Sequence, residues 1–279
     1  MITEMVDADL ARKLEFAEIH AWNDQWDAFP DLARKYRMRK QWVEGALILS
    51  CLDIPFVEFN RALGVGLAAS ATEEGLDRIL EAFASEGVDQ YLIHRIPQTQ
   101  PAELDGWLRT RNLSPSGGWD RIFRSDEPLP ADVSIPSQFQ VERVTQKTST
   151  EWADFIVTMY DLEPTRQMLL ALAARPGWFH YMLREGHDIV AVRTMYLHPD
   201  GVAWWGIEAP VPGFMTDRFD LDYYLNQEII QDGLAQGAKT FVADVEAADP
   251  DMGHEGYRYF SKLGFRKAYR RENYAPHPK

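Results

Sequence analysis

The sequence predicts an α/β (α+β) protein in which one order of strands and helices is used twice. The clearest copy occupies residues 203–274 and reads strand, loop, helix, strand, helix, strand. Its first helix carries Leu221, Leu225 and Ile229 on one face and ends at Gly237. A similar order of elements occurs about 150 residues earlier, which indicates an internal duplication.

In the first half, residues 10–38 are predicted to form two helices, and residues 42–67 a pair of strands, WVEGALILSCL and FVEFNRALGVGL. The next helix opens at Thr72, a good N-terminal cap, and ends near Gly87. A strand (DQYLIHRI), a helix (PAELDGWLRTRNL) and a strand (WDRIFRS) follow.

In the second half, a strand (FQVERV) leads to two helices, STEWADFIVTMYDL and PTRQMLLALAARPG. The strands WFHYMLREG and HDIVAVRTMYLHPDG are joined by a turn at Glu185 and Gly186, and another turn leads into AWWGIEA. After the helix that ends in glycine, Phe241, Ala243 and Val245 alternate, as one face of a strand does.

The two halves match element by element. The strand YLIHRI corresponds to TFVADV, LRTRNL to FSKLGF, and WDRIFRS to FRKAYRR. A proline-rich stretch lies between the halves and is typical of a linker. The sequence therefore predicts a first domain at 1–127, a linker at 128–137 and a second domain at 138–279.

The segment YFSKLGF, which comes after a strand that follows a helix ending in glycine, resembles the C-terminal half of acyltransferases of the GNAT superfamily. The resemblance covers the second half of the chain. It implies two tandem GNAT-like domains, the first degenerate, each with a mixed, mostly antiparallel central sheet flanked by helices. It also implies an acyl-CoA, such as acetyl-CoA, as co-substrate between two central strands.

Composition narrows the class of protein. Hydrophobic residues make up 46% and charged residues 26% of the 279, and no apolar run approaches the ~20 residues of a membrane span. The single cysteine, Cys51, and an acidic, amphipathic N-terminus predict a cytoplasmic protein rather than a secreted one. The histidines show no metal-ligand spacing, so no metal site is expected.

A net charge of −14 argues against a nucleic-acid partner, which requires basic patches. The same charge attracts small cationic amines, although it also serves solubility alone. A homodimer is one assembly that GNAT domains form through their sheets. Packing of the two halves against each other is the alternative.

The resemblance places the turn that binds the pyrophosphate of CoA at the start of the helix after AWWGIEA. The glycines of the family motif are absent there, and aspartates stand in their place. A carboxylate ~5 Å from a phosphate is repelled by roughly 3 kcal/mol. Residues 212–215 are an alternative position for the turn. The candidate donor-binding residues are Ile207, Ala209, Arg218, Phe219, Asp220, Leu221 and Asp222.

Three residues are candidates for catalysis. Glu208 ends the strand before this turn, where the family often places its general base, although a solvated glutamate is the plain alternative. Many GNAT enzymes use a tyrosine as general acid at the position of Phe260, so the neighbouring Tyr257 and Tyr259 are candidates for that role. Packing in the core is the alternative for both.

Four further residues are candidates for substrate binding: Trp205, Asp244, Glu246 and His254. Asp244 and Glu246 share one face of a strand and lead into the acidic loop with His254, and Trp205 could line an acyl slot. Core packing is the default interpretation for Trp205, and an exposed acidic loop is the default for the other three. The leading functional hypothesis is an acyl-CoA-dependent N-acyltransferase, with acetyl as the expected group, acting on a small amine by direct transfer. The alternatives are a GNAT-fold protein that binds a cationic ligand or partner without CoA, and an enzyme that uses a carrier-protein thioester or decarboxylates.

Overall fold

The chain divides into two compact units. A computed structural model describes residues 6–54, 56–129, 134–212, 219–246 and 255–277, and the side chains of 219, 220, 246 and 255–258 lie outside the description. The first unit is Met5–Arg121 together with Ala268–Lys279, and the second unit is Ile122–Lys267. The predicted domain bounds of 1–127 and 138–279 stay a prediction, because compact units and duplicated halves need not coincide.

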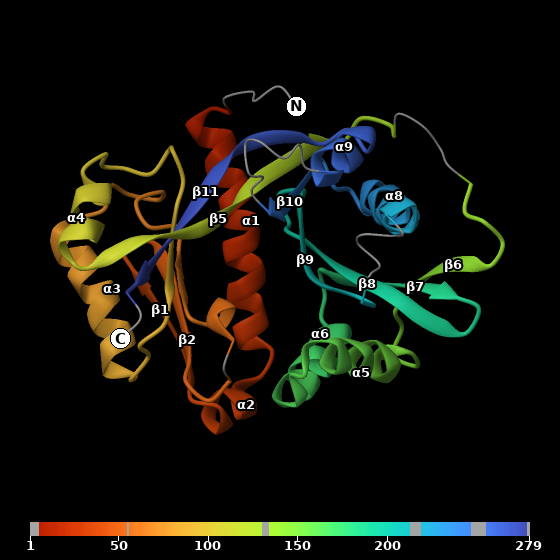
Figure 1. Ribbon diagram of the computed structural model, residues 1–279, viewed down its shortest axis with the longest axis horizontal. Helices are drawn as coiled ribbons and strands as arrows, with labels where there is room; N and C mark the ends of the chain where they lie inside the picture. Colours follow the sequence, from red (N-terminus) through yellow and green to blue (C-terminus); the bar gives the residue numbers. More distant parts are fainter. Residues whose placement is uncertain (1–5, 55, 130–133, 213–218, 247–254, 278–279) are drawn as a thin grey trace. The chain divides into compact units, whose positions relative to one another are not determined.

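The first unit is a sheet with helices on both faces. Figure 1 shows α1 along one face and α3 and α4 along the other. In chain order its elements are α1 (Ala8–Asp27), α2 (Pro30–Lys35), β1 (Met38–Val43), β2 (Ala46–Cys51), η1 (Val57–Phe59), β3 (Arg61–Leu63), α3 (Glu73–Ser85), β4 (Leu92–Arg95), α4 (Leu104–Thr110), most of β5 (Leu113–Ser125) and most of β11 (Arg266–Pro276).

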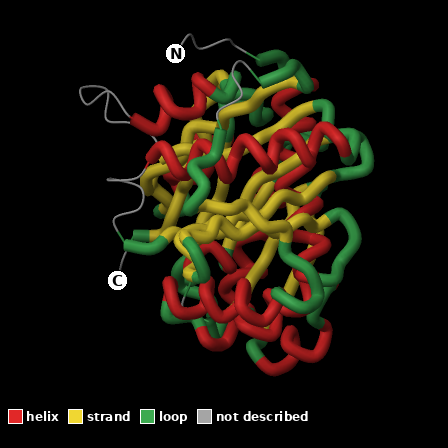
Figure 2. Tube along the Cα trace, turned by 90° about the vertical axis from the view of Figure 1, so that its right-hand side faces the viewer, coloured by secondary structure: helices red, strands yellow, loops and turns green. Residues whose placement is uncertain are grey.

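The second unit has the same layering. Helices α5 and α6 cover one face of its strands and α8 and α9 the other (Figure 1), and Figure 2 likewise shows strands lying between helices. Its elements are β6 (Phe139–Arg143), α5 (Ser149–Tyr160), η2 (Glu163–Thr165), α6 (Arg166–Ala173), β7 (Trp178–Glu185), β8 (Asp188–Leu197), β9 (Val202–Pro210), α8 (Phe219–Ala235), β10 (Thr240–Glu246) and α9 (Glu255–Lys262).

Strand pairing repeats between the units. The hydrogen-bonded order is β1-β2-β3-β4-β11-β5 in the first unit and β10-β9-β8-β7-β6 in the second. In each unit an antiparallel set leads to a parallel pair, β3 with β4 in the first and β9 with β10 in the second. The helix between the strands of each parallel pair, α3 or α8, makes the crossover that such a pair requires. The predicted mixed, mostly antiparallel architecture is confirmed.

Apolar cores fill both faces of the second unit. One core packs α8 and α9 onto the sheet and contains Trp205, Leu225 and Phe241, all buried. The other packs α5 and α6 onto the opposite face around Trp152 and Met182. None of the helices in the described part of the chain combines the length and apolar character that crossing a membrane requires.

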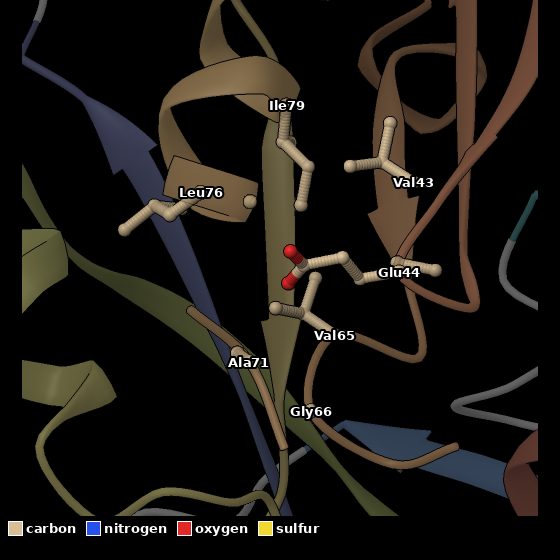
Figure 3. A pocket seen from close by; sticks show the side chains of 9 residues that line it. Val43, Glu44, Val65, Gly66, Ala71, Leu76 and Ile79 are labelled. Atoms are coloured by element: carbon tan, nitrogen blue, oxygen red, sulfur yellow. The ribbon is translucent and has the colours of Figure 1, made fainter. Parts of the chain in front are cut away.

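Both members of the strand pair predicted at residues 42–67 were wrong in part. In FVEFNRALGVGL only β3 (Arg61–Leu63) is a strand, and it follows the 3-10 helix η1. The segment WVEGALILSCL is not one strand, because Glu44 and Gly45 have φ values of 50° and 82° and turn the chain between β1 and β2. The turn directs the Glu44 carboxylate to the start of α3, where it accepts from the backbone N–H (3.1 Å) and hydroxyl (2.8 Å) of Thr72. Figure 3 shows this carboxylate reaching into a small pocket. A Cβ at Gly75 would lie 2.1 Å from it, so the close approach requires glycine.

Candidate functional site

The two strands that the resemblance identifies as flanking the donor are β9 and β10. Their parallel ladder joins Thr240–Val242 to Val202–Trp204. In the described residues no further pair of this ladder is found, although β9 continues to Pro210 and β10 to Glu246. The candidate residues of these two strands therefore lie on the parts that extend past the shared hydrogen bonds, and they are Trp205, Ile207, Glu208, Ala209, Asp244 and Glu246.

A bulge in β9 sets the direction of Glu208. The register of β8 against β9 shifts at Arg193, so that this one residue faces both Ile207 and Glu208. Ile207 has a φ of 52°, a conformation that β-branched residues seldom adopt and that costs roughly 1–2 kcal/mol. In a regular strand Trp205 and Glu208 would point to opposite faces. The bulge brings both onto the face that α8 covers, where both contact Arg193.

Arg193 is the centre of a buried polar cluster. The residue is 5% exposed, and its guanidinium donates to a carboxylate oxygen of Glu208 and to the amide oxygen of Asn226, each at 2.5 Å. A carboxylate oxygen of Asp222 lies 3.6 Å away. Burial disfavours the charge, but the carboxylates of Asp222 and Glu208 outweigh it and raise the pKa of Arg193.

Helices α8 and α9 supply the rest of this cluster. Asp222 and Asn226 are four residues apart on α8, hence on one face, and the Asn226 amide donates to Asp222 at 3.0 Å. The same amide donates to the hydroxyl of Tyr259 on α9. Burial raises the pKa of Asp222 against the effect of Arg193, and burial together with Asp222 raises the pKa of Tyr259 well above its usual value. We call Arg193, Glu208, Asp222, Asn226 and Tyr259 the Arg193 cluster.

Glu208 is the member of the Arg193 cluster that solvent reaches. Its side chain is 58% exposed, whereas the other four residues are buried. From the opposite face of the sheet, the hydroxyl of Tyr160 at the end of α5 donates to the backbone oxygen of Glu208 at 2.5 Å. Arg193 thus fixes the Glu208 carboxylate from the buried side, and Tyr160 fixes the Glu208 backbone. The carboxylate itself remains accessible to a substrate.

Two buried hydrogen-bond donors belong to the Arg193 cluster and to Trp205, which contacts it. The indole N–H of Trp205 and the Nε of Arg193 have no hydrogen-bond partner among the described residues. Buried donors are nearly always satisfied in native proteins. Two unsatisfied donors beside an exposed carboxylate are therefore consistent with a ligand that offers an acceptor atom, such as a carbonyl oxygen.

The candidate catalytic residues are partly brought together. Glu208 and Tyr259 belong to the same cluster and are linked through Arg193 and Asn226. The hydroxyl of Tyr259 lies inside this network, with Asp222 as a further partner. The side chain of Tyr257 lies outside the described residues, and the roles of base and acid stay predictions.

The candidate donor-binding residues that the structure describes have buried side chains or face the Arg193 cluster. Ala209 is fully buried against α5, and Leu221 is 2% exposed in the core under α8. Asp222 turns inward to Arg193, so its charge is neutralised inside the protein rather than presented at the start of the helix. Arg218 and the side chains of Phe219 and Asp220 lie outside the described residues.

Among the substrate candidates, Trp205 is 5% exposed and packs against Phe241, Phe260 and Phe265, which supports the core alternative for most of its ring. Asp244 is half-buried on β10. The side chain of Glu246 and all of His254 lie outside the described residues.

Sequence reasoning missed Arg193 and Asn226. The signal for Arg193 was its place in the alternating strand VAVRTMYL, where it shares a face with the buried Ala191 and Met195. The signal for Asn226 was its spacing of four from Asp222. Neither signal identifies the partner, because the partners lie on other elements.

The backbone is similar to that of several solved acetyltransferases. A GCN5-related N-acetyltransferase (GNAT) from Kribbella flavida matches with a TM-score of 0.60 and 16% identity over 91% of this chain and 96% of that one. A tandem GNAT protein from the clavulanic acid biosynthesis pathway matches with a TM-score of 0.56 and 11% identity over 84% and 80%. The chain has the tandem GNAT fold.

A GCN5-related N-acetyltransferase from Sphaerobacter thermophilus also matches, with a TM-score of 0.56 and 12% identity over 82% of this chain and 79% of that one. No family model and no curated protein matches the sequence. The prediction of a tandem GNAT architecture is confirmed. At such identities the likeness establishes the fold, whereas the activity depends on the site residues.

Proposed function

We propose that the second unit is an acyl-CoA-dependent N-acyltransferase that acts on a small amine by direct transfer, with acetyl as the expected acyl group. The observation that carries the proposal is Glu208, an exposed carboxylate held at the bulge where β9 extends beyond its ladder with β10. A general base has to reach solvent and substrate, and it also has to keep a fixed position. Arg193 and Tyr160 supply that fixed position.

The described residues fit the proposed donor. When bound, acyl-CoA supplies a thioester whose acyl carbon accepts the amine nitrogen and whose thiolate leaves. The indole N–H of Trp205 and the Nε of Arg193, which find no partner in the described part of the chain, could donate to its carbonyl oxygen. Asp222, one of three aspartates that would repel a diphosphate, is turned away and neutralised. Glu208 accepts the proton that the ammonium group of the acceptor gives up.

Calorimetric titration with acetyl-CoA tests the donor. We expect binding with one donor site in the second unit, and no detectable heat at millimolar acetyl-CoA would refute the proposal.

Replacing the proposed base tests the chemistry. We expect Glu208→Gln to lower kcat about 10²–10⁴-fold with little change in the affinity for acetyl-CoA, because a positioned base contributes a factor of that size. Glu142→Gln on β6 is the matched control, since it also removes a glutamate paired with an arginine, Arg184. Equal losses in both variants would show that Glu208 is a structural residue.

A second candidate function is binding of a cationic ligand without acyl transfer. The observation that favours it is that both groups proposed for proton transfer are already engaged, Glu208 with Arg193 and Tyr259 with Asn226. Thermal stabilisation by alkylamines combined with no response to acetyl-CoA would select this function over transfer.

A further inference from the structure

The Arg193 cluster contains a second carboxylate that the proposed reaction does not use. Asp222 on α8 is buried, whereas the side chain of Glu208 on β9 reaches solvent. A single nitrogen of Arg193, Nη2, donates to Glu208 at 2.5 Å and lies 3.6 Å from an oxygen of Asp222. The two carboxylates therefore lie within the range of ~6 Å over which like charges disfavour each other. One cation serves both of them, and a substrate can reach only one.

Asn226 fixes the guanidinium in this position. The residue is fully buried, and its amide oxygen accepts from the other terminal nitrogen of Arg193 at 2.5 Å. Its amide nitrogen donates to Asp222 at 3.0 Å and to the hydroxyl of Tyr259. Exchanging the oxygen and nitrogen of this amide would set donor against donor at Arg193 and acceptor against acceptor at Asp222. The amide thus has one possible orientation, and it holds Asp222 beside Arg193.

The charges of the two carboxylates are coupled through space. Burial raises the pKa of Asp222, Arg193 lowers it, and the charge of Glu208 raises it. The hydroxyl of Tyr259 and the amide of Asn226 complete the polar groups that face Asp222 from the described elements. An interaction between two titrating groups is mutual, so a charge on Asp222 disfavours a charge on Glu208 to the same extent.

A base that is held by an arginine needs a counterweight. An arginine paired with a single carboxylate favours its charged form, which makes the carboxylate a weaker acceptor of protons. We propose that Asp222 is a positioning residue that engages part of the charge of Arg193 and thereby keeps Glu208 basic enough to accept the proton of the acceptor ammonium group. This role rests on the proposed function, in which Glu208 is the base. The other contact of Glu208, from the Tyr160 hydroxyl to its backbone, involves no charge.

The pH dependence of acyl transfer tests the role of Asp222. Asp222→Asn removes the charge but keeps an acceptor for Asn226 and Tyr259, so that Arg193 is left to Glu208 alone. We expect the acid limb of the kcat/KM profile to move down by about one pH unit, because Glu208 becomes less basic. On the plateau kcat should fall about threefold with unchanged affinity for acetyl-CoA. An acid limb that stays in place would overturn the proposal.

Asp232→Asn is the matched control. Asp232 lies on the same helix, accepts from the hydroxyl of Tyr181 at 2.6 Å and lies 3.4 Å from Arg143, so it too is an aspartate with a tyrosine and an arginine as partners. It is roughly 15 Å along the helix from Asp222. This variant should leave the acid limb where it is. An equal displacement in both variants would show a general effect of charge on α8 and would contradict the proposal.

Nuclear magnetic resonance of the wild-type protein tests the coupling without turnover and without a variant that has to fold. Carboxyl groups that interact strongly titrate in two steps. With carbon-13 in the glutamate carboxyl groups, we expect two steps for the Glu208 signal, which Glu208→Gln identifies by its loss. A single step would overturn the proposal. A protein that binds acetyl-CoA but never transfers an acyl group would refute the proposed function, whereas transfer with an unmoved acid limb in Asp222→Asn would refute the role of Asp222 alone.

Discussion

At the scale of single residues, Arg193 is buried in the second unit with partners on two other elements. Glu208 on β9 and Asp222 and Asn226 on α8 all depend on its guanidinium. The arginine therefore links the candidate base to α8, the helix at whose start the donor-binding turn is predicted. A buried ion pair contributes little net stability, but removing one of its members leaves the other charge unpaired.

We expect Arg193→Met to lower the free energy of unfolding by about 3–5 kcal/mol, because Asp222 is 2% exposed and would lose its cation. Adding Asp222→Asn should recover most of this loss, since the double variant buries no charge at either position. Urea denaturation of the single and double variants measures both quantities.

Arg184→Met provides the comparison for this pair of variants. Arg184 on β7 also binds two carboxylates, but those of Glu142 and Glu151 are 30% and 51% exposed. Its loss should cost less than about 1 kcal/mol. If Arg193→Met cost no more than that, the buried cluster would not be held by charge pairing.

At the scale of elements, the start of α3 is bound by the carboxylate of Glu44, which lies in the turn between β1 and β2. The hydroxyl and N–H of Thr72 and the guanidinium of Arg78 lower the pKa of Glu44, with the Thr72 hydroxyl as the largest cause. A carboxyl group whose pKa is lower in the folded than in the unfolded state stabilises the fold at pH values above its pKa in the unfolded state. That stabilisation is lost as the pH falls through its pKa in the folded state.

We therefore expect Glu44→Gln to lower the free energy of unfolding by about 1 kcal/mol at pH 7, with a smaller effect once the pH falls below the ordinary glutamate value of 4.5. Thermal unfolding at pH 7 and at pH 3.5 measures the difference. Glu81→Gln, on the exposed side of the same helix, should show neither effect. A difference between wild type and Glu44→Gln that grows in acid would contradict this account of the cap.

The elements themselves were largely predictable because their signals are local. Alternation of apolar residues identifies β10, and the segment YFSKLGF identifies α9 and its turn. The turn at Glu44 was missed because the apolar run around it resembles a single strand. A turn with positive φ at a glutamate has no strong signature in the sequence.

The candidate site was predictable only in part. The sequence indicated that Glu208 lies at the end of a strand. The bulge at Ile207, which turns the Glu208 side chain, arises from the pairing of β9 with β8 and has no signal in the segment itself. The partners Arg193 and Asn226 come from two elements whose contact depends on the folded sheet. Pattern reasoning along one segment therefore identifies the carboxylate and not the residues that position it.

At the scale of the whole molecule, the two compact units do not follow the order of the chain. Strand β11 comes last in the sequence, yet residues from Ala268 onward belong to the first unit. There Asn273 pairs with His94 of β4, and the Tyr269 hydroxyl donates to Glu15 of α1 at 2.9 Å. The C-terminal strand is thus an integral part of the sheet that the first half of the chain begins.

We expect removal of residues 268–279 to destabilise the first unit more than the second, although the deletion is furthest from it in sequence. Hydrogen exchange should show loss of protection in β4 and α1, because β4 loses one of its two hydrogen-bonded neighbours and α1 loses the partner of Glu15. The amides of β7 and β8 serve as the internal control. Unchanged hydrogen exchange of the β4 amides would mean that the first unit folds without β11.

This arrangement has a consequence for synthesis in the cell. The ribosome releases α1 through most of β5 well before it makes Ala268 and the residues after it. At 5–20 residues per second the nascent chain waits about 7–30 s with the edge of β4 uncovered. An open strand edge is a template for wrong pairing, so chaperones that shield the growing polypeptide should matter more for this protein than for one whose domains are completed in turn.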